Sequence, residues 1–102
     1  MTDLPEPEVD ELALTTVLSA LADDVRLTIV RELAAAGEQA CGTLELGVSK
    51  ATRSHHFRVL RESGVTHTRI EGTRRFVVLR RDDLDDRFPG LLDALLAATP
   101  AR

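Results

Sequence analysis

The sequence predicts a small, mostly α-helical domain that carries one β-hairpin, an α+β arrangement. The chain has 102 residues, the size of one domain. Apolar residues recur at helical spacing before Gly64 and again near the C-terminus. Between these regions, residues 65–70 and 73–80 are rich in Val, Thr, Ile and Phe and flank Glu71 and Gly72. Two strand-like runs around a two-residue loop that ends in glycine are typical of a hairpin.

The two ends of the chain predict short tails around this domain. Residues 1–8 hold two prolines and few apolar residues and predict a flexible acidic tail, residues 9–98 form the domain, and residues 99–102 form a second tail. No run approaches the ~20 consecutive apolar residues of a membrane span. The N-terminus lacks the basic-then-apolar order of a secretory signal, and the single cysteine, Cys41, leaves no internal disulfide. We therefore expect a cytoplasmic protein without a membrane partner.

Two amphipathic helices are predicted in the first part of the domain. The first starts near Val9, and four of its apolar residues recur at the spacing of one helical face: Leu14, Val17, Leu18 and Leu21. Asp23 is a suitable N-cap for the second helix, and Gly37 is placed to end it. The next segment, residues 40–46, is short and ambiguous, with one or two helical turns as one interpretation.

A third helix is bounded by strong local signals. Ser49 is a favoured N-cap and Gly64 a favoured stop, so we predict a helix over residues 50–63. One side of this helix carries small, polar or basic residues: Ala51, Thr52, Ser54, His55 and Arg58. A short helical element and a glycine-containing turn at residues 46–48 come before it, which is a helix-turn-helix layout.

The last helical region follows the predicted hairpin. Asp82 is placed to cap it, and leucines recur at helical spacing as far as Leu96. The dipeptide at residues 89–90 divides this region, with Pro89 suited to the first turn of a new helix.

Net charge is unevenly distributed along the chain. The overall charge is −4, yet residues 50–81 hold nine Lys and Arg against two acidic residues, a net charge of +7. The segments on either side are acidic, at −8 and −3. A basic block in an acidic chain indicates a polyanionic partner for that block. A solvated basic face is the alternative, and charge alone does not decide between them.

Two stretches of sequence carry a closer resemblance. Residues 18–27 (LSALADDVRL) resemble the L-x-x-L-x-D-x-x-R-L opening of the ArsR/SmtB family of bacterial repressors. Residues 48–65 (VSKATRSHHFRVLRESGV) resemble that family's recognition-helix segment, whose hallmark is an S-x-x-T-x-S-H-H run that ends in L-x-x-x-G. Residues 71–75 (EGTRR) look like the tip of its wing. The resemblance covers residues 12–96.

The resemblance implies a winged helix-turn-helix that binds operator DNA. The helix after Ser49 would enter the major groove, and the wing would reach the neighbouring minor groove or phosphates. The residues implied in DNA binding are Ser49, Lys50, Ala51, Thr52, Arg53, Ser54, His55 and Arg58 on the helix, with Arg69, Arg74 and Arg75 on the wing. Arg53 departs from the family pattern, which has an aliphatic residue facing the core there. Its stem can lie along apolar surface with its head in solvent or on DNA, so a DNA contact by Arg53 stays open.

The resemblance also implies a homodimer. Members of the family pair through their first and last helices, and the corresponding apolar residues are Leu14, Val17, Leu18, Leu21, Leu91, Leu92 and Leu95. A two-fold dimer requires a palindromic site with half-sites about 10 bp apart or a multiple of that spacing. Members repress their operators until an inducer weakens binding; the sequence does not name the inducer.

The usual metal sites of the family are absent from the sequence. Only Cys41 matches the family's cysteine pair, because Gln39 stands at the first position, and the chain after Ile70 contains no histidine. The adjacent His55 and His56 point about 100° apart on a helix and cannot readily hold one ion together. We interpret Cys41 as a small buried packing residue, with a redox-sensing thiol and part of an unusual metal site as alternatives. No cofactor or metal is expected.

The sequence bears on three classes of function. A dimeric, operator-binding repressor accounts for the basic helix and wing. A winged protein-interaction or dimerisation module is the alternative, although such domains normally lack a basic recognition helix. An enzyme is not expected, because the sequence holds no P-loop, dinucleotide fingerprint, nucleophile–base arrangement or metal cluster.

Overall fold

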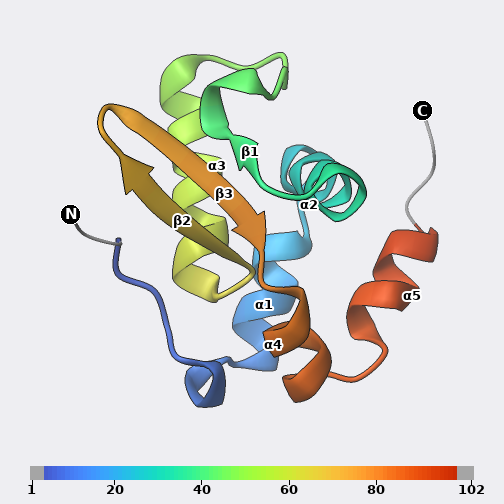
Figure 1. Ribbon diagram of the computed structural model, residues 1–102. Coiled ribbons are helices and arrows are strands. Elements are labelled where there is room, and N and C mark those ends of the chain that lie inside the picture. The colour runs from blue at the N-terminus through green and yellow to red at the C-terminus, as the bar shows by residue number, and fades with distance from the viewer. Residues whose placement is uncertain (1–3, 99–102) are drawn as a thin grey trace.

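The hairpin lies across a set of short helices in the computed structural model, which describes residues 4–98 (Figure 1). In chain order the elements are the 3-10 turn η1 (Val9–Glu11), α1 (Leu14–Leu21), α2 (Asp24–Ala36), β1 (Gln39–Ala40), the 3-10 turn η2 (Cys41–Thr43), α3 (Lys50–Ser63), β2 (Thr66–Glu71), β3 (Arg74–Leu79), α4 (Arg81–Arg87) and α5 (Leu91–Ala98). The predicted fold class, mostly α with a hairpin wing beside a helix-turn-helix, is confirmed.

The sheet contains one strand that the sequence did not indicate. Strands β2 and β3 pair antiparallel with Glu71 opposite Arg74, so the hairpin loop is Gly72–Thr73, one residue later than predicted. The short strand β1 adds to the other edge of β3 and pairs Gln39 with Val77. A two-residue strand is too short to show an alternating pattern, and it forms where the edge of β3 offers unpaired backbone groups.

Local signals placed the ends of α2 and α3 correctly. The Asp23 side chain accepts a hydrogen bond from the backbone N–H of Arg26 at the start of α2. The Ser49 side chain does the same for Thr52 at the start of α3. Gly64 ends α3 in the left-handed conformation, with φ of 90°, where glycine carries no steric penalty.

Other local expectations differ in detail. The ambiguous segment before α3 consists of β1, the 3-10 turn η2 and an extended loop. It contains a single helical turn and no α-helix. The first helical region is split into η1 and α1. Asp82 is not a cap, because α4 begins at Arg81 and Asp82 lies in its first turn. Pro89 precedes α5, which begins at Leu91.

The hydrophobic core explains a correction to the predicted dimer face. It combines buried side chains from α1, α2, α3, the sheet, α4 and α5. Three of the residues predicted at a dimer interface, Val17, Leu21 and Leu92, are at most 4% exposed within the single chain. They are core residues, so the prediction of an interface role was wrong for them. In contrast, Leu14 and Leu18 are 46% and 41% exposed.

The segment before η1 also differs from its prediction. Residues 4–8, expected to belong to a flexible tail, make specific contacts with the base of the hairpin. Glu6 Oε1 lies 2.7 Å from His67 Nδ1, and Arg80 donates to the Pro7 carbonyl at 2.7 Å. Residues 1–3 and 99–102, the rest of the predicted tails, lie outside the described residues. Among the helices of the described chain, none is long and apolar enough to cross a membrane.

Candidate DNA-binding surface

The side of α3 that faces away from the core carries most of the predicted DNA contacts. Six of these residues are exposed, namely Lys50, Ala51, Thr52, Ser54, His55 and Arg58. The preceding Ser49 is exposed as well, and its hydroxyl holds the backbone of Thr52 in the first turn. Free N–H groups and the positive end of the helix dipole at this turn favour phosphate. The structure therefore presents a small, polar and basic helix face to solvent.

The opposite side of α3 anchors the helix to the rest of the domain. Phe57 and Leu60 are buried in the core. His56 is 8% exposed, and its Nδ1 lies 3.0 Å from the guanidinium of Arg26. A guanidinium has no acceptor, so Arg26 donates in this bond. His56 is therefore a buried packing residue whose ring is hydrogen-bonded to a neighbouring helix.

The hairpin places two further arginines beside α3. Arg74 and Arg75 are exposed at the start of β3, next to the turn at Gly72. The guanidinium carbon of Arg74 lies 4.9 Å from the centre of the Phe76 ring, a cation–π contact that leaves its N–H groups free to donate. Among residues 4–98, neither arginine has a carboxylate within ion-pair distance.

Arg69 is placed differently from the other predicted wing residues. Its Nε and Nη2 each donate to a carboxylate oxygen of Glu38 at 3.0 Å. Glu71 lies 3.6 Å away on the other side. The side-chain hydrogen bond with Arg69 holds the pKa of Glu38 below its usual value, and the same bond raises the pKa of Arg69. The Arg69 guanidinium, which the resemblance implied in DNA binding, is thus already paired with two carboxylates.

Arg53, on the inner side of α3, and Cys41, in η2, line the same space between α3 and the hairpin. Arg53 is half-buried, and its Nη1 donates to the carbonyl of Leu44 at 3.4 Å. Cys41 is half-buried in η2, and burial raises the pKa of its thiol, an effect that the charges of Arg75 and Arg53 offset only in part. Within the described part of the chain, no group of three His, Cys, Asp or Glu residues is arranged to hold a metal ion.

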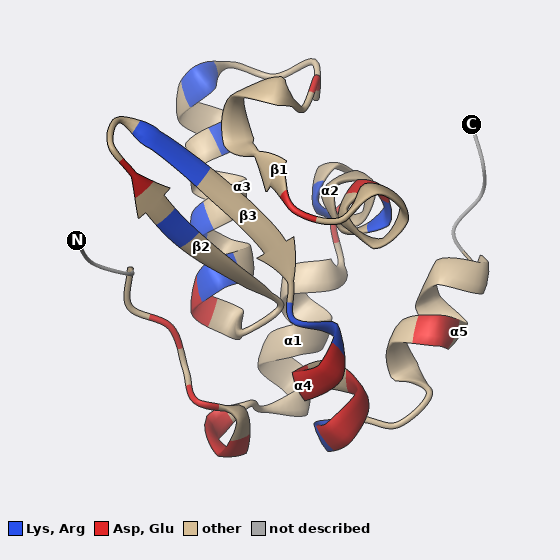
Figure 2. Cartoon of the chain, viewed as in Figure 1, with Lys and Arg blue, Asp and Glu red and all other residues tan. Residues whose placement is uncertain are grey.

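Charge is separated in space as well as along the chain. Figure 2 shows Lys and Arg gathered on α3 and the hairpin, and Asp and Glu gathered on α4, η1 and the segment before it. The acidic cluster is used partly inside the protein: Arg80 pairs with Asp83 at 3.0 Å and with Glu6 at 3.5 Å. The two basic elements therefore form one face, while most of the acidic residues lie elsewhere.

One feature near this face was not found from the sequence. Arg61 and Thr68, which carried no predicted role, join Phe57 and Cys41 around a cavity between α3 and the hairpin. A basic residue on the inward side of an amphipathic helix was the available signal for Arg61. Nothing local indicates that Thr68 faces it from another element.

Comparison with known proteins agrees with this architecture. A family model described as a helix-turn-helix domain matches residues 21–69, and together with the wing this defines a winged helix-turn-helix domain. The chain is 36% identical over 89 residues to YceK of Bacillus subtilis (strain 168), an uncharacterized HTH-type transcriptional regulator. That match spans 84% of this chain and 89% of YceK. The chain belongs to the family of HTH-type transcriptional regulators and has the winged, ArsR/SmtB-like architecture.

Two solved structures resemble it as well. The transcriptional repressor BigR from Xylella fastidiosa superposes with a TM-score of 0.67 and 32% identity, over 87% of this chain and 88% of BigR. A fragment (1–100) of a possible transcriptional regulatory protein from Mycobacterium bovis gives a TM-score of 0.65 and 28% identity, over 82% of this chain and 90% of that one. Their likeness extends from the helix-turn-helix to most of the described chain.

Proposed function

We propose that this transcriptional regulator is a homodimeric repressor that binds a palindromic operator through α3 and the wing and is released by a signal. One observation carries the DNA-binding part: Lys50, Arg58, Arg74 and Arg75 share one exposed face, and within residues 4–98 none has a carboxylate partner. Cations without a carboxylate partner are available to phosphate, whereas ion-paired ones must first lose their partner. Arg69 is therefore left out of the proposed contacts.

The roles of the individual residues follow from their positions. The exposed first turn of α3, from Ser49 to Thr52, would lie against a phosphate and the groove floor. Ser54 and His55 would face base edges, where small and donor side chains allow close approach. Arg74 and Arg75 at the hairpin tip suit the narrow, electronegative minor groove of A·T-rich DNA. Repression is supported by the likeness to BigR, which is itself a transcriptional repressor.

The proposed dimer uses the apolar surface that the single chain leaves uncovered. Leu14 and Leu18 lie four residues apart on α1, and both are more than 40% exposed. Leu91 and Leu95 on α5 are only half-buried. Exposed leucines at one turn of spacing on a helix are typical of an interface. Dimerisation through these two helices would leave α3 of each protomer free for DNA.

The primary test is selection of genomic fragments by the purified protein at ~0.15 M salt, followed by a salt titration on each enriched sequence. An enriched palindrome with a steep salt dependence is the expected result. Enrichment of no sequence, or equal binding to all, would instead favour a protein-interaction module. Replacing both Ser54 and His55 with Ala should abolish selective binding while the dimer persists.

The dimer has its own test in sedimentation equilibrium. Changing Leu14 and Leu18 together to Asp should yield monomers, because two buried carboxylates would oppose association. Val48→Asp is the matched control, since Val48 is also an exposed apolar residue, at 36%, but lies before α3. A dimer that survives the α1 substitutions would remove this face from the interface.

A further inference from the structure

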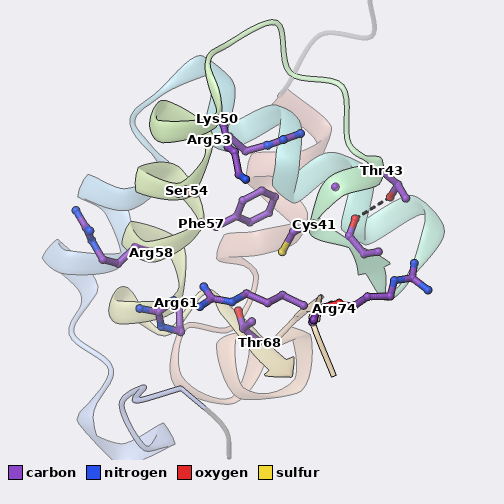
Figure 3. Close-up of a pocket in the computed structure, with 14 residues that line it drawn as sticks. Cys41, Thr43, Lys50, Arg53, Ser54, Phe57, Arg58, Arg61, Thr68 and Arg74 are labelled. Carbon is purple, nitrogen blue, oxygen red and sulfur yellow. Dashed lines mark hydrogen bonds between the residues drawn. The ribbon is translucent and has the colours of Figure 1, made fainter. Parts of the chain in front are cut away.

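A cavity of about 570 Å³ lies between α3 and the hairpin, closed at one end by β1 and η2 (Figure 3). Six of its lining residues are cations: Lys50, Arg53, Arg58, Arg61, Arg74 and Arg75. We call this cavity the α3–wing pocket. None of the residues that line it is acidic. A volume of this size falls in the range of small-molecule sites.

The inner wall of the α3–wing pocket is apolar or neutral. Phe57 is 7% exposed and Thr68 is 2% exposed, and both contribute to the lining. Cys41 lies beside them, and Figure 3 shows its sulfur and the Phe57 ring in the space between α3 and the hairpin. A neutral thiol and an aromatic ring favour contact with the apolar body of a ligand.

The cations of the pocket divide by depth. Lys50, Arg58, Arg74 and Arg75 are exposed. On the inward side of α3, Arg53 is half-buried and the Arg61 side chain is mostly buried. The four exposed cations are placed to meet DNA phosphate on the outer surface. The two inner arginines lie beside Phe57, which the protein already covers almost completely. A DNA duplex is too wide to enter the pocket that far.

Arg61 has unused hydrogen-bonding capacity. Its side chain is 12% exposed, and its only ion pair among residues 4–98 is a distant one, 3.9 Å from Glu62 on the surface. Its Nε is buried and has no hydrogen-bond partner in the described part of the chain. A buried charged donor without a partner is costly, and an anionic oxygen in the pocket would supply the partner.

We propose that the α3–wing pocket binds a small organic anion, with the acid group on Arg61 and the apolar body against Phe57. The occupied pocket would weaken DNA binding, because the anion neutralises cations between α3 and the wing and separates the two elements. This regulatory part rests on the proposed DNA-binding function, whereas the binding of the anion does not.

The binding test is an NMR titration of the ¹⁵N-labelled full chain with 2-naphthoate at ~0.15 M salt. Saturable shifts are expected at the amides of Cys41, Phe57, Arg61 and Thr68, with half-saturation at or below about 1 mM for a ligand of this size. 2-Naphthylmethanol, which lacks the charge, and inorganic phosphate, which lacks the apolar body, should each bind at least about tenfold more weakly. Equal binding of the neutral alcohol, shifts confined to α1 and α5, or no saturation would overturn the proposal.

Two variants and one control locate the site. Arg61→Met keeps the stem and removes the charge, and should weaken 2-naphthoate binding at least about tenfold. Cys41→Phe fills the pocket without changing a charge and should also abolish binding, so the result does not depend on one variant folding well. Arg81→Met removes an arginine that is outside the pocket and pairs with Asp85 and Asp93, and should bind 2-naphthoate like the unaltered chain.

The regulatory part is tested separately with a labelled operator duplex. 2-Naphthoate should lower the affinity for DNA, and Arg61→Met should remove this sensitivity. If the anion binds in the NMR experiment but the protein selects no DNA, the proposed function fails and the pocket stands. If the protein binds DNA and 2-naphthoate binds the pocket without changing that affinity, the regulatory part is overturned.

Discussion

The guanidinium of Arg26 in α2 donates a hydrogen bond to Nδ1 of His56 in the recognition helix α3, at 3.0 Å. The same side chain donates through Nε to the carbonyl of Ala20 at the end of α1. Its backbone N–H is held by Asp23. Three consecutive helices are thus tied together by one arginine, and the exposed face of α3 is oriented by the buried face behind it.

Substitution of His56 should therefore affect stability, whereas substitution of His55 should affect DNA binding. His56→Ala leaves the half-buried donor of Arg26 without its partner and should lower the free energy of unfolding by about 2 kcal/mol. His55→Ala removes an exposed side chain and should change it by less than about 0.5 kcal/mol while weakening DNA binding. Urea unfolding and binding to a labelled duplex separate the two effects. A destabilised His55→Ala protein would contradict the placement of the two rings.

The wing arginines should differ in the salt dependence of DNA binding. Arg75→Gln removes an unpaired cation, so the slope of log affinity against log salt should become shallower by about 1. Arg69→Gln removes a cation that Glu38 already neutralises through two hydrogen bonds, so the slope should stay the same. A shallower slope for Arg69→Gln would mean that Arg69 leaves Glu38 when DNA binds.

Gly64 and Gly72 form a matched pair of substitutions at positive φ. A Cβ on Gly64 would lie 2.0 Å from Leu12 Cδ2, a buried atom, in a residue with φ of +90°. Gly64→Ala should therefore destabilise the protein by at least about 2 kcal/mol. A Cβ on Gly72 meets no atom within 4 Å, so Gly72→Ala should cost only the backbone strain, about 1 kcal/mol. Denaturant midpoints at constant m-value measure both.

The Asp23 cap should make stability depend on pH in the acid range. The backbone hydrogen bond from Arg26, together with the charge of Arg26, lowers the pKa of Asp23. A carboxyl with a lowered pKa in the folded state stabilises the protein above its unfolded value of about 3.9, and this contribution is lost as pH falls through the folded pKa.

Asp23→Asn separates the cap from the charge. The amide keeps the capping oxygen but not the charge, so the variant should be less stable than the unaltered protein at neutral pH. The difference in free energy of unfolding between the two proteins should narrow below about pH 4. Asp23→Ala loses the cap itself and should be about 1 kcal/mol less stable at neutral pH. A gap for Asp23→Asn that does not change with pH would show that the charge contributes nothing.

Cys41 should react slowly with alkylating reagents. Burial raises the pKa of its thiol, and the thiolate is the reactive form. Iodoacetamide at neutral pH should therefore modify Cys41 more slowly than it modifies N-acetylcysteine. Cys41→Ser should keep its affinity for DNA under mild oxidant and under reductant alike. Fast alkylation, or a loss of DNA binding that only the unaltered protein shows on oxidation, would favour the redox-sensing alternative.

Predictions from sequence succeeded where the cause of the structure is local. Ser49 and Gly64 bound α3 because a cap and a left-handed residue act within one turn of the helix end. The hairpin followed from two β-branched runs around a short loop, with an error of one residue in the loop. The exposed side of α3 followed from the helical period alone.

Predictions failed where the environment of a residue depends on which distant element packs against it. Val17 and Leu18 are adjacent, and both fit a helical apolar pattern, yet the first is fully buried and the second is 41% exposed. Periodicity identifies the apolar residues of a helix, but not which of them the core of the single chain buries and which it leaves exposed. Arg69 and Arg75 look alike in sequence, and only the approach of Glu38 from a segment 31 positions away distinguishes them.

The sequence by itself determined the order of elements, the ends of α2 and α3, and the basic character of the recognition helix and wing, because capping, helical period and charge are properties of short segments. The tertiary structure alone decided which leucines of α1 remain exposed, which arginines remain unpaired, and that Arg61 and Phe57 face Thr68 across a pocket. Each of these depends on contacts between residues that are far apart in the sequence, and a local sequence pattern does not encode such contacts.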